Sequence, residues 1–289
     1  MNLERYALLG LVGSGVVCGL VLLLAWASRE SAAKAARTWL GAQAVASAWL
    51  FGQATSFGGL PEFPPLQSTD KVFWLTAGAA GLMCIDSLLE NRRALRLVLR
   101  AAYGFAVPWV LLSRALERAP TSQVLTTVLG LGAALILTCV ALSAWAERRH
   151  GASVPLLLAW VTALGAGALF QTGTAKVAQF AGILVAVLCA AAVVGRLRPQ
   201  FALGTGAASV ASVLLASFWI VGVWFSDLPV EVGVLLALAP VATALADLGP
   251  LSNLEGARGS LARFAVASLF AVPAFLLAWI QQPPPNPYG

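Results

Sequence analysis

The chain has 289 residues, of which 60% are hydrophobic and only 10% are charged, whereas an ordinary soluble domain has roughly 45–50% apolar and about 25% charged residues. This composition excludes a soluble globular fold, because a chain of this length cannot hide so much apolar side chain from water. The net charge of +6 would suit a nucleic-acid partner, but the Lys and Arg residues lie in small groups between apolar runs rather than along one face, so we expect no nucleic-acid binding.

The polar stretches between the apolar runs are too short for a second, aqueous domain. We therefore expect one all-α membrane domain over residues 1–280, a polytopic helical bundle with short loops, and a proline-rich C-terminal tail over residues 281–289. The bilayer is its first expected partner. The first apolar run is about 22 residues long, which is too long for the core of a signal peptide.

A bilayer core of roughly 30 Å needs about 20 apolar residues in a helix, because every backbone polar group must be paired within the segment. Runs near that length predict about ten spans: Tyr6–Ala27, Thr38–Phe57, Val72–Glu90, Leu97–Leu116, Gln123–Ala146, Ala152–Phe170, Val177–Gly195, Phe201–Phe225, Val230–Leu248 and Ala262–Ile280. The weakest are the second, which Gln43 and Gln53 dilute, and the fourth, which carries Arg100 and Arg114.

The basic residues alternate with the spans, and Lys and Arg concentrate on the cytoplasmic side of a membrane. The turns after odd-numbered spans hold Arg29, Lys34, Arg37, Arg92, Arg93, Arg96, Arg100, Arg148, Arg149, Arg196, Arg198, Arg258 and Arg263. The opposite side holds Arg5, Lys71, Arg114, Arg118 and Lys176. This bias predicts a protein of a bacterial-type cytoplasmic (inner) membrane with both termini outside.

Charged side chains near the span ends are candidate ion-pair or coupling residues. Asp86 and Glu90 are four residues apart, and Arg93 follows three residues later, so all three would share one helical stripe. We expect Asp86 to pair with nearby arginines, and we expect Arg100 to enter the fourth span with its side chain directed back to the interface. Asp247, at the cytoplasmic end of the ninth span, is expected to pair in the same way.

Two central prolines raise a sharper hypothesis. Ten spans divide into possible halves of five, residues 1–150 and 151–280, and an odd number in each half would place the halves in opposite orientation. Pro108 and Pro240 then lie in corresponding spans, and such helix breaks mark a midplane substrate site in secondary transporters. Ten spans in under 300 residues is similar in outline to the drug/metabolite transporter superfamily. That family keeps both termini cytoplasmic, opposite to the charge bias here, and the chain shows no motif of it.

The chain offers few residues that could form a catalytic site. The chain has one histidine, His150, in a basic turn, and four cysteines in separate apolar runs, so neither a metal site nor a catalytic triad can be assembled from the pattern. No phosphate loop or nucleophile elbow occurs. We expect no enzyme, no metal and no cofactor.

Two functional classes remain. The first is a structural or accessory subunit of a larger membrane complex, with other membrane subunits or a second copy of the chain as partner. The second is a secondary transporter for a small neutral or amphipathic solute. The proline-rich connection Gly58–Lys71 is a candidate cap for a binding cavity or a contact surface for a partner, and the C-terminal tail is a candidate for docking on a surface.

Overall fold

The computed structural model describes residues 3–27, 34–89, 92–117, 119–198, 201–249, 251–254 and 256–281, and within them it contains ten α-helices and no strand. The helices are α1 (Leu3–Ala27), α2 (Lys34–Phe57), α3 (Ser68–Leu88), α4 (Arg93–Leu116), α5 (Thr121–Arg148), α6 (Ser153–Gln171), α7 (Ala175–Leu197), α8 (Gly204–Phe225), α9 (Val230–Leu248) and α10 (Gly256–Ile280). For these residues, the prediction of an all-helical fold with ten helices is confirmed.

Eight of these helices, all except α2 and α3, are long and apolar enough to cross a membrane. α2 is as long as the others, but it is rich in small and polar residues, and half of the residues in its second half are buried against other helices. Its composition therefore matches a helix surrounded by protein rather than by lipid. The predicted bounds differ most at α10, which begins at Gly256 instead of Ala262.

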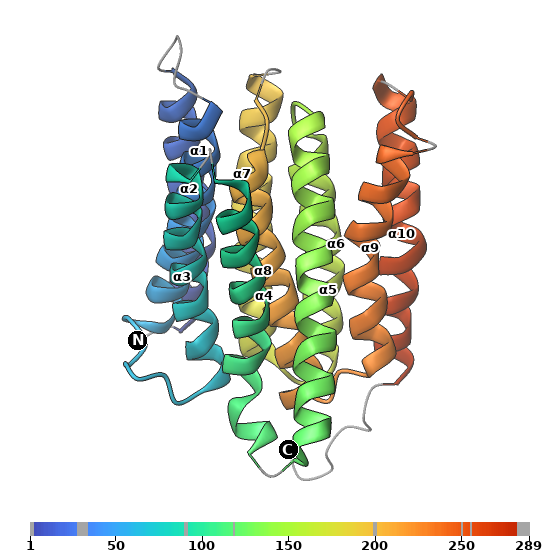
Figure 1. Cartoon of the computed structure of the whole chain (residues 1–289). Helices are drawn as coiled ribbons and strands as arrows, with labels where there is room; N and C mark the ends of the chain where they lie inside the picture. The colour runs from blue at the N-terminus through green and yellow to red at the C-terminus, as the bar shows by residue number, and fades with distance from the viewer. Residues whose placement is uncertain are drawn as a thin grey trace.

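The helices run alternately up and down the bundle (Figure 1). The turns that follow the odd-numbered helices lie at one end, which we call the arginine-rich end. The α2–α3 loop (residues 58–67), the start of α1 and the end of α10 lie at the other, the outer end. α8 is the central helix and packs against α2, α3, α4, α5, α7 and α9. The two sequence halves interlock, because α1 packs on α7 and α5 packs on α9.

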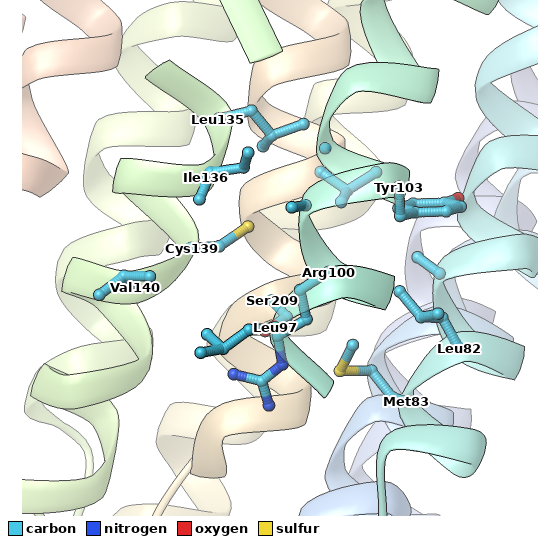
Figure 2. Close-up of a pocket in the computed structure, with 14 residues that line it drawn as sticks. Leu82, Met83, Leu97, Arg100, Tyr103, Leu135, Ile136, Cys139, Val140 and Ser209 are labelled. Carbon is cyan, nitrogen blue, oxygen red and sulfur yellow. The ribbon is translucent and has the colours of Figure 1, made fainter. Parts of the chain in front are cut away.

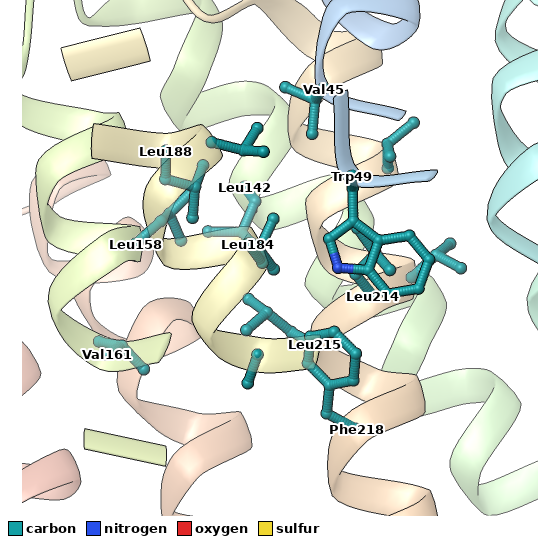
Figure 3. Close-up of a cluster of buried hydrophobic side chains, with 14 of the residues drawn as sticks. Val45, Trp49, Leu142, Leu158, Val161, Leu184, Leu188, Leu214, Leu215 and Phe218 are labelled. Atoms are coloured by element: carbon teal, nitrogen blue, oxygen red, sulfur yellow. The ribbon is translucent and has the colours of Figure 1, made fainter. Parts of the chain in front are cut away.

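The interior is filled by large side chains where α2, α7 and α8 meet (Figure 3). The buried indole of Trp49 donates a hydrogen bond from Nε1 to the carbonyl oxygen of Phe180, at 3.0 Å. Its ring lies 5.9 Å from the ring centre of Phe180 and 6.1 Å from that of Phe218. Leu184 and Leu214 are buried beside these rings. Dispersion contacts of this kind hold membrane helices together, since lipid supplies no hydrophobic drive between them.

Candidate functional site

The arginine-rich end holds two buried carboxylates, each bound by two arginines. Asp86, near the end of α3, is 1% exposed. Arg100 of α4 binds it in a bidentate way, with Nε 2.9 Å from Oδ1 and Nη2 2.7 Å from Oδ2, and Arg96 adds a third bond of 2.9 Å to Oδ2. A buried charge needs such partners, because desolvation would otherwise penalise it heavily. We call this group the α3–α4 ion cluster.

Asp247, near the end of α9, is the centre of the second group. Arg149, which follows α5, donates from Nε to Oδ2 at 2.7 Å and from Nη2 to Oδ1 at 3.0 Å. Arg263 of α10 donates from Nε to Oδ1 at 2.6 Å. The same two arginines also donate to the backbone carbonyls of Ser252 and Leu254, at 2.8 Å each. We call this group the α5–α9–α10 ion cluster, since it joins three helices.

The predicted stripe of Asp86, Glu90 and Arg93 does not extend to Arg93, which lies on another helix. α3 ends at Leu88, and the amide of Leu89 closes its last turn on the carbonyls of Ile85 and Asp86. Arg93 therefore begins α4, and it cannot continue a stripe on α3. The backbone of Arg93 is described but not its side chain, and Glu90 lies outside the described residues.

Arg96 is a partner that the sequence analysis did not assign to Asp86. The first turns of α4 lie beside the last turns of α3, so residues 10 and 14 positions after Asp86 reach its carboxylate. The antiparallel packing of α3 and α4 could have revealed this pair. Two basic residues four positions apart near the start of a helix lie on one face, and in a helical hairpin that face can meet a carboxylate near the end of the preceding helix.

The two central prolines do not meet. Pro108 is buried inside α4 and Pro240 is buried inside α9, and both helices continue through them. α4 packs on α3, α5 and α8, whereas α9 packs on α5, α6, α8 and α10, so α5 and α8 stand between the two prolines. The helices are not broken there, and the two residues do not build a common site.

A small apolar cavity, the α4–α5 cavity, lies between α3, α4, α5 and α8 (Figure 2), with a volume of about 70 Å³. Its rim includes Leu97 and Val140, which are 62% and 53% exposed on the outer surface of the bundle. Arg100 and Tyr103 also line it, and the Tyr103 hydroxyl donates to the carbonyl of Leu75. The cavity is smaller than the roughly 150 Å³ that admits benzene in other proteins, so it suits a short stretch of alkyl chain.

Glycines bring α4 and α5 together beside this cavity. A Cβ on Gly104 would lie 2.5 Å from Cγ1 of Ile136, and one on Gly132 would lie 2.2 Å from Cδ1 of Phe105. Sequence reasoning did not find this site, because its residues come from four helices and most of them are ordinary apolar residues.

The outer end carries the α2–α3 loop. It is anchored at its base, where Lys176 of α7 donates to Oε1 of Gln67 at 3.1 Å and lies 5.3 Å from the ring centre of Phe57. Within the loop, Phe63 packs edge-on against Trp74, with ring centres 5.3 Å apart. A cavity of about 230 Å³ lies under the loop, beside Lys176 and Asp70.

Within the part of the chain that the structure describes, no three His, Cys, Asp or Glu residues come together in a way that could hold a metal ion. His150 is exposed beside the α5–α6 turn, apart from the four cysteines in the helices. Comparison with known proteins returned no match: no family model fits the chain, and neither does a curated protein or a solved structure.

Proposed function

We propose that the protein is a non-catalytic subunit or scaffold of a larger membrane assembly. In this account all ten helices cross a bacterial-type cytoplasmic membrane, and the arginine-rich end faces the cytoplasm. The observation that carries the proposal is an apolar surface on the α2–α3 loop, outside the ends of the helices. Leu60, Phe63 and Leu66 are 73%, 77% and 55% exposed there.

These three side chains form what we call the loop patch. Burying one fully exposed side chain of this kind contributes roughly 1.5–3 kcal/mol, and contiguous apolar surface outside the lipid-facing band marks an interaction site. The loop is pre-ordered by Gln67 at its base and by the Phe63–Trp74 contact. A pre-ordered loop loses little entropy on binding, which favours a stable contact with another protein.

The bundle interior supports a scaffold more than a moving transporter. The two ion clusters join neighbouring helices at the arginine-rich end, and the aromatic group around Trp49 fills the centre. α4 and α9 run unbroken through their prolines. Alternating access needs repeats that rock against each other around a midplane site, whereas this packing favours one rigid body.

The proposal predicts that the loop patch holds the partner. The chain is purified from its native membrane in mild detergent, as the natural sequence and as the triple variant Leu60→Ser, Phe63→Ser, Leu66→Ser. The partner should be recovered with the natural chain and lost from the triple variant. Glu62→Gln is the matched control, because Glu62 is exposed in the same loop and should leave recovery unchanged. Recovery of the natural chain as a monomer without a stoichiometric partner would contradict the proposal.

The second candidate is a secondary transporter for a small amphipathic solute, and the α4–α5 cavity favours it. The cavity opens on the outer surface of the bundle and places one cation, Arg100, beside an apolar pocket. The test compares the efflux of uncharged amphipathic dyes from proteoliposomes that contain the natural chain with efflux from proteoliposomes that contain the Cys139→Phe variant. In this variant the larger side chain fills the cavity. Efflux by the natural chain that the variant abolishes would favour a transporter, and efflux equal to that of empty vesicles would exclude these dyes as substrates.

A further inference from the structure

A basic cavity opens at the arginine-rich end, where α5, α6, α7 and α10 meet. Its volume is about 890 Å³, and four arginines line it: Arg148, Arg149, Arg196 and Arg263. His150, Ser153 and Ser260 add further hydrogen-bond donors to its wall, while Glu147 is not among the lining residues. We call it the basic basin.

The charge of the basic basin is only partly balanced. Arg149 and Arg263 share one carboxylate, that of Asp247. Arg148 and Arg196 are exposed, and neither takes part in an ion pair with any residue that the structure describes. The basin is therefore lined by two arginines that share one carboxylate and by two exposed arginines that form no ion pair with any described residue. Such a concave positive surface concentrates anions.

A backbone contact between the end of α7 and the α5–α6 turn brings Arg148 and Arg196 to the same cavity. The end of α7 lies directly against the α5–α6 turn, where a Cβ on Gly195 would come 2.6 Å from the carbonyl carbon of Gly151. The amide of Gly151 donates to the carbonyl of Phe201 at 2.6 Å, and Gly151 has a φ of +83° that favours glycine. Arg196, next to Gly195, thereby lines the same cavity as Arg148.

We propose that the basic basin binds a phosphate ester, namely the headgroup of an anionic phospholipid of the cytoplasmic leaflet. Arginine binds phosphate through its planar, multiply donating guanidinium. The first turn of α6 also borders the basin, at Ser153, where the helix dipole favours negative charge. This ligand goes beyond the partner protein proposed above, although its assignment to the cytoplasmic leaflet rests on the orientation proposed there.

The apolar side of the basin favours a lipid as the source of the phosphate. Leu156 and Phe264 line the basin, and Leu156 is 44% exposed on the bundle surface. One turn further along α6, Trp160 is 40% exposed and donates from Nε1 to Oγ of Ser268 on α10, at 3.1 Å. The surface of α6 and α10 below the basin thus offers an apolar path for an acyl chain.

Native mass spectrometry of the purified full chain tests the proposal with two lipids that share their acyl chains, dioleoyl phosphatidylglycerol and dioleoyl phosphatidylcholine. We expect the anionic lipid to bind more tightly. Arg148→Gln and Arg196→Gln should each weaken it about fivefold, and the double variant about 25-fold, with phosphatidylcholine unchanged. Both side chains are exposed and form no ion pair within the described part of the chain, so the variants should fold.

Arg92→Gln is the matched control, since Arg92 is exposed at the same end but does not line the basin. It should leave the affinity for phosphatidylglycerol unchanged. An equal loss in Arg92→Gln would mean that diffuse surface charge, and not the basin, attracts the lipid. Equal binding of the two lipids by the natural chain would also overturn the proposal.

Competition with inorganic phosphate distinguishes the two possible sources of the bound phosphate group, a phospholipid headgroup and free phosphate. Added at millimolar concentration, it should displace phosphatidylglycerol only weakly if the acyl chain contributes to binding. Complete displacement that depends on Arg148 and Arg196 would keep the basin as a phosphate site and overturn the lipid as its source.

Discussion

Each of the two ion clusters consists of an aspartate bound by two arginines, but the two clusters join very different parts of the chain. In the α3–α4 ion cluster, Asp86 binds two arginines of the next helix, and both arginine side chains are 26% exposed. In the α5–α9–α10 ion cluster, Asp247 binds arginines 98 residues before it and 16 residues after it. Arg263 is only 4% exposed there. The first cluster closes one hairpin, whereas the second fixes the two halves of the sequence to each other.

Burial of the arginines decides what happens when a carboxylate is removed. An arginine at the membrane boundary can extend its side chain to water, so Arg96 and Arg100 have an alternative to Asp86. Arg263 is almost fully buried, even though it lines the basic basin, so its guanidinium reaches water less easily. Removing one partner of a buried pair leaves an uncompensated charge, which is costly even where the intact pair stabilises little.

Asp247→Asn is expected to have the largest effect. It leaves buried Arg263 without its carboxylate and loosens α5, α9 and α10 at once, so we expect a loss of about 3–5 kcal/mol in the free energy of unfolding. Thermal denaturation in detergent, followed by tryptophan fluorescence, measures it. Asp227→Asn is the control, because Asp227 is an exposed carboxylate in the α8–α9 loop and should change little.

Asp86→Asn should cost less, about 1–3 kcal/mol, since it removes an acceptor of charge-assisted hydrogen bonds whose donors can still reach water. The same denaturation assay applies. If Asp86→Asn lowered the free energy of unfolding as much as Asp247→Asn, neither the number of helices joined nor the burial of the arginines would determine how much a cluster stabilises the fold.

Arg96→Gln should have the smallest effect, at most about 1 kcal/mol. Arg100 alone keeps two hydrogen bonds to Asp86, so one of the three hydrogen bonds is lost and the carboxylate stays paired. Arg100→Gln in the same assay should cost more, and the reverse order would show that Arg96 is the principal partner of Asp86.

Sequence reasoning reached the helices because the length of an apolar run is a local property. It also singled out Asp86, Arg100 and Asp247, since charge at the end of an apolar run is conspicuous. It missed Arg96 as a partner because the position of the α3–α4 turn decides which residues face each other. Arg149 and Arg263 were counted only as topological signals, and their shared carboxylate depends on how α5, α9 and α10 pack.

The α4–α5 cavity and the basic basin were beyond the reach of sequence patterns for the same reason. Each assembles residues from four helices, and no spacing along the chain links them. Conversely, Pro108 and Pro240 have a conspicuous pattern, but α5 and α8 separate them in space. Similar positions in two halves therefore predict a shared site only when the halves also pack symmetrically.

In the topology that we propose, all ten helices cross the membrane and the arginine-rich end faces the cytoplasm. The α2–α3 loop tests it most directly, because α2 and α3 are the two helices that fall short of the apolarity of a span. Glu62→Cys and His150→Cys, labelled with a membrane-impermeant maleimide, report the two ends of the bundle. We predict that Glu62→Cys reacts in intact cells and His150→Cys only after lysis. If both reacted only after lysis, α2 and α3 would not cross the membrane, and the ten-span account would be contradicted.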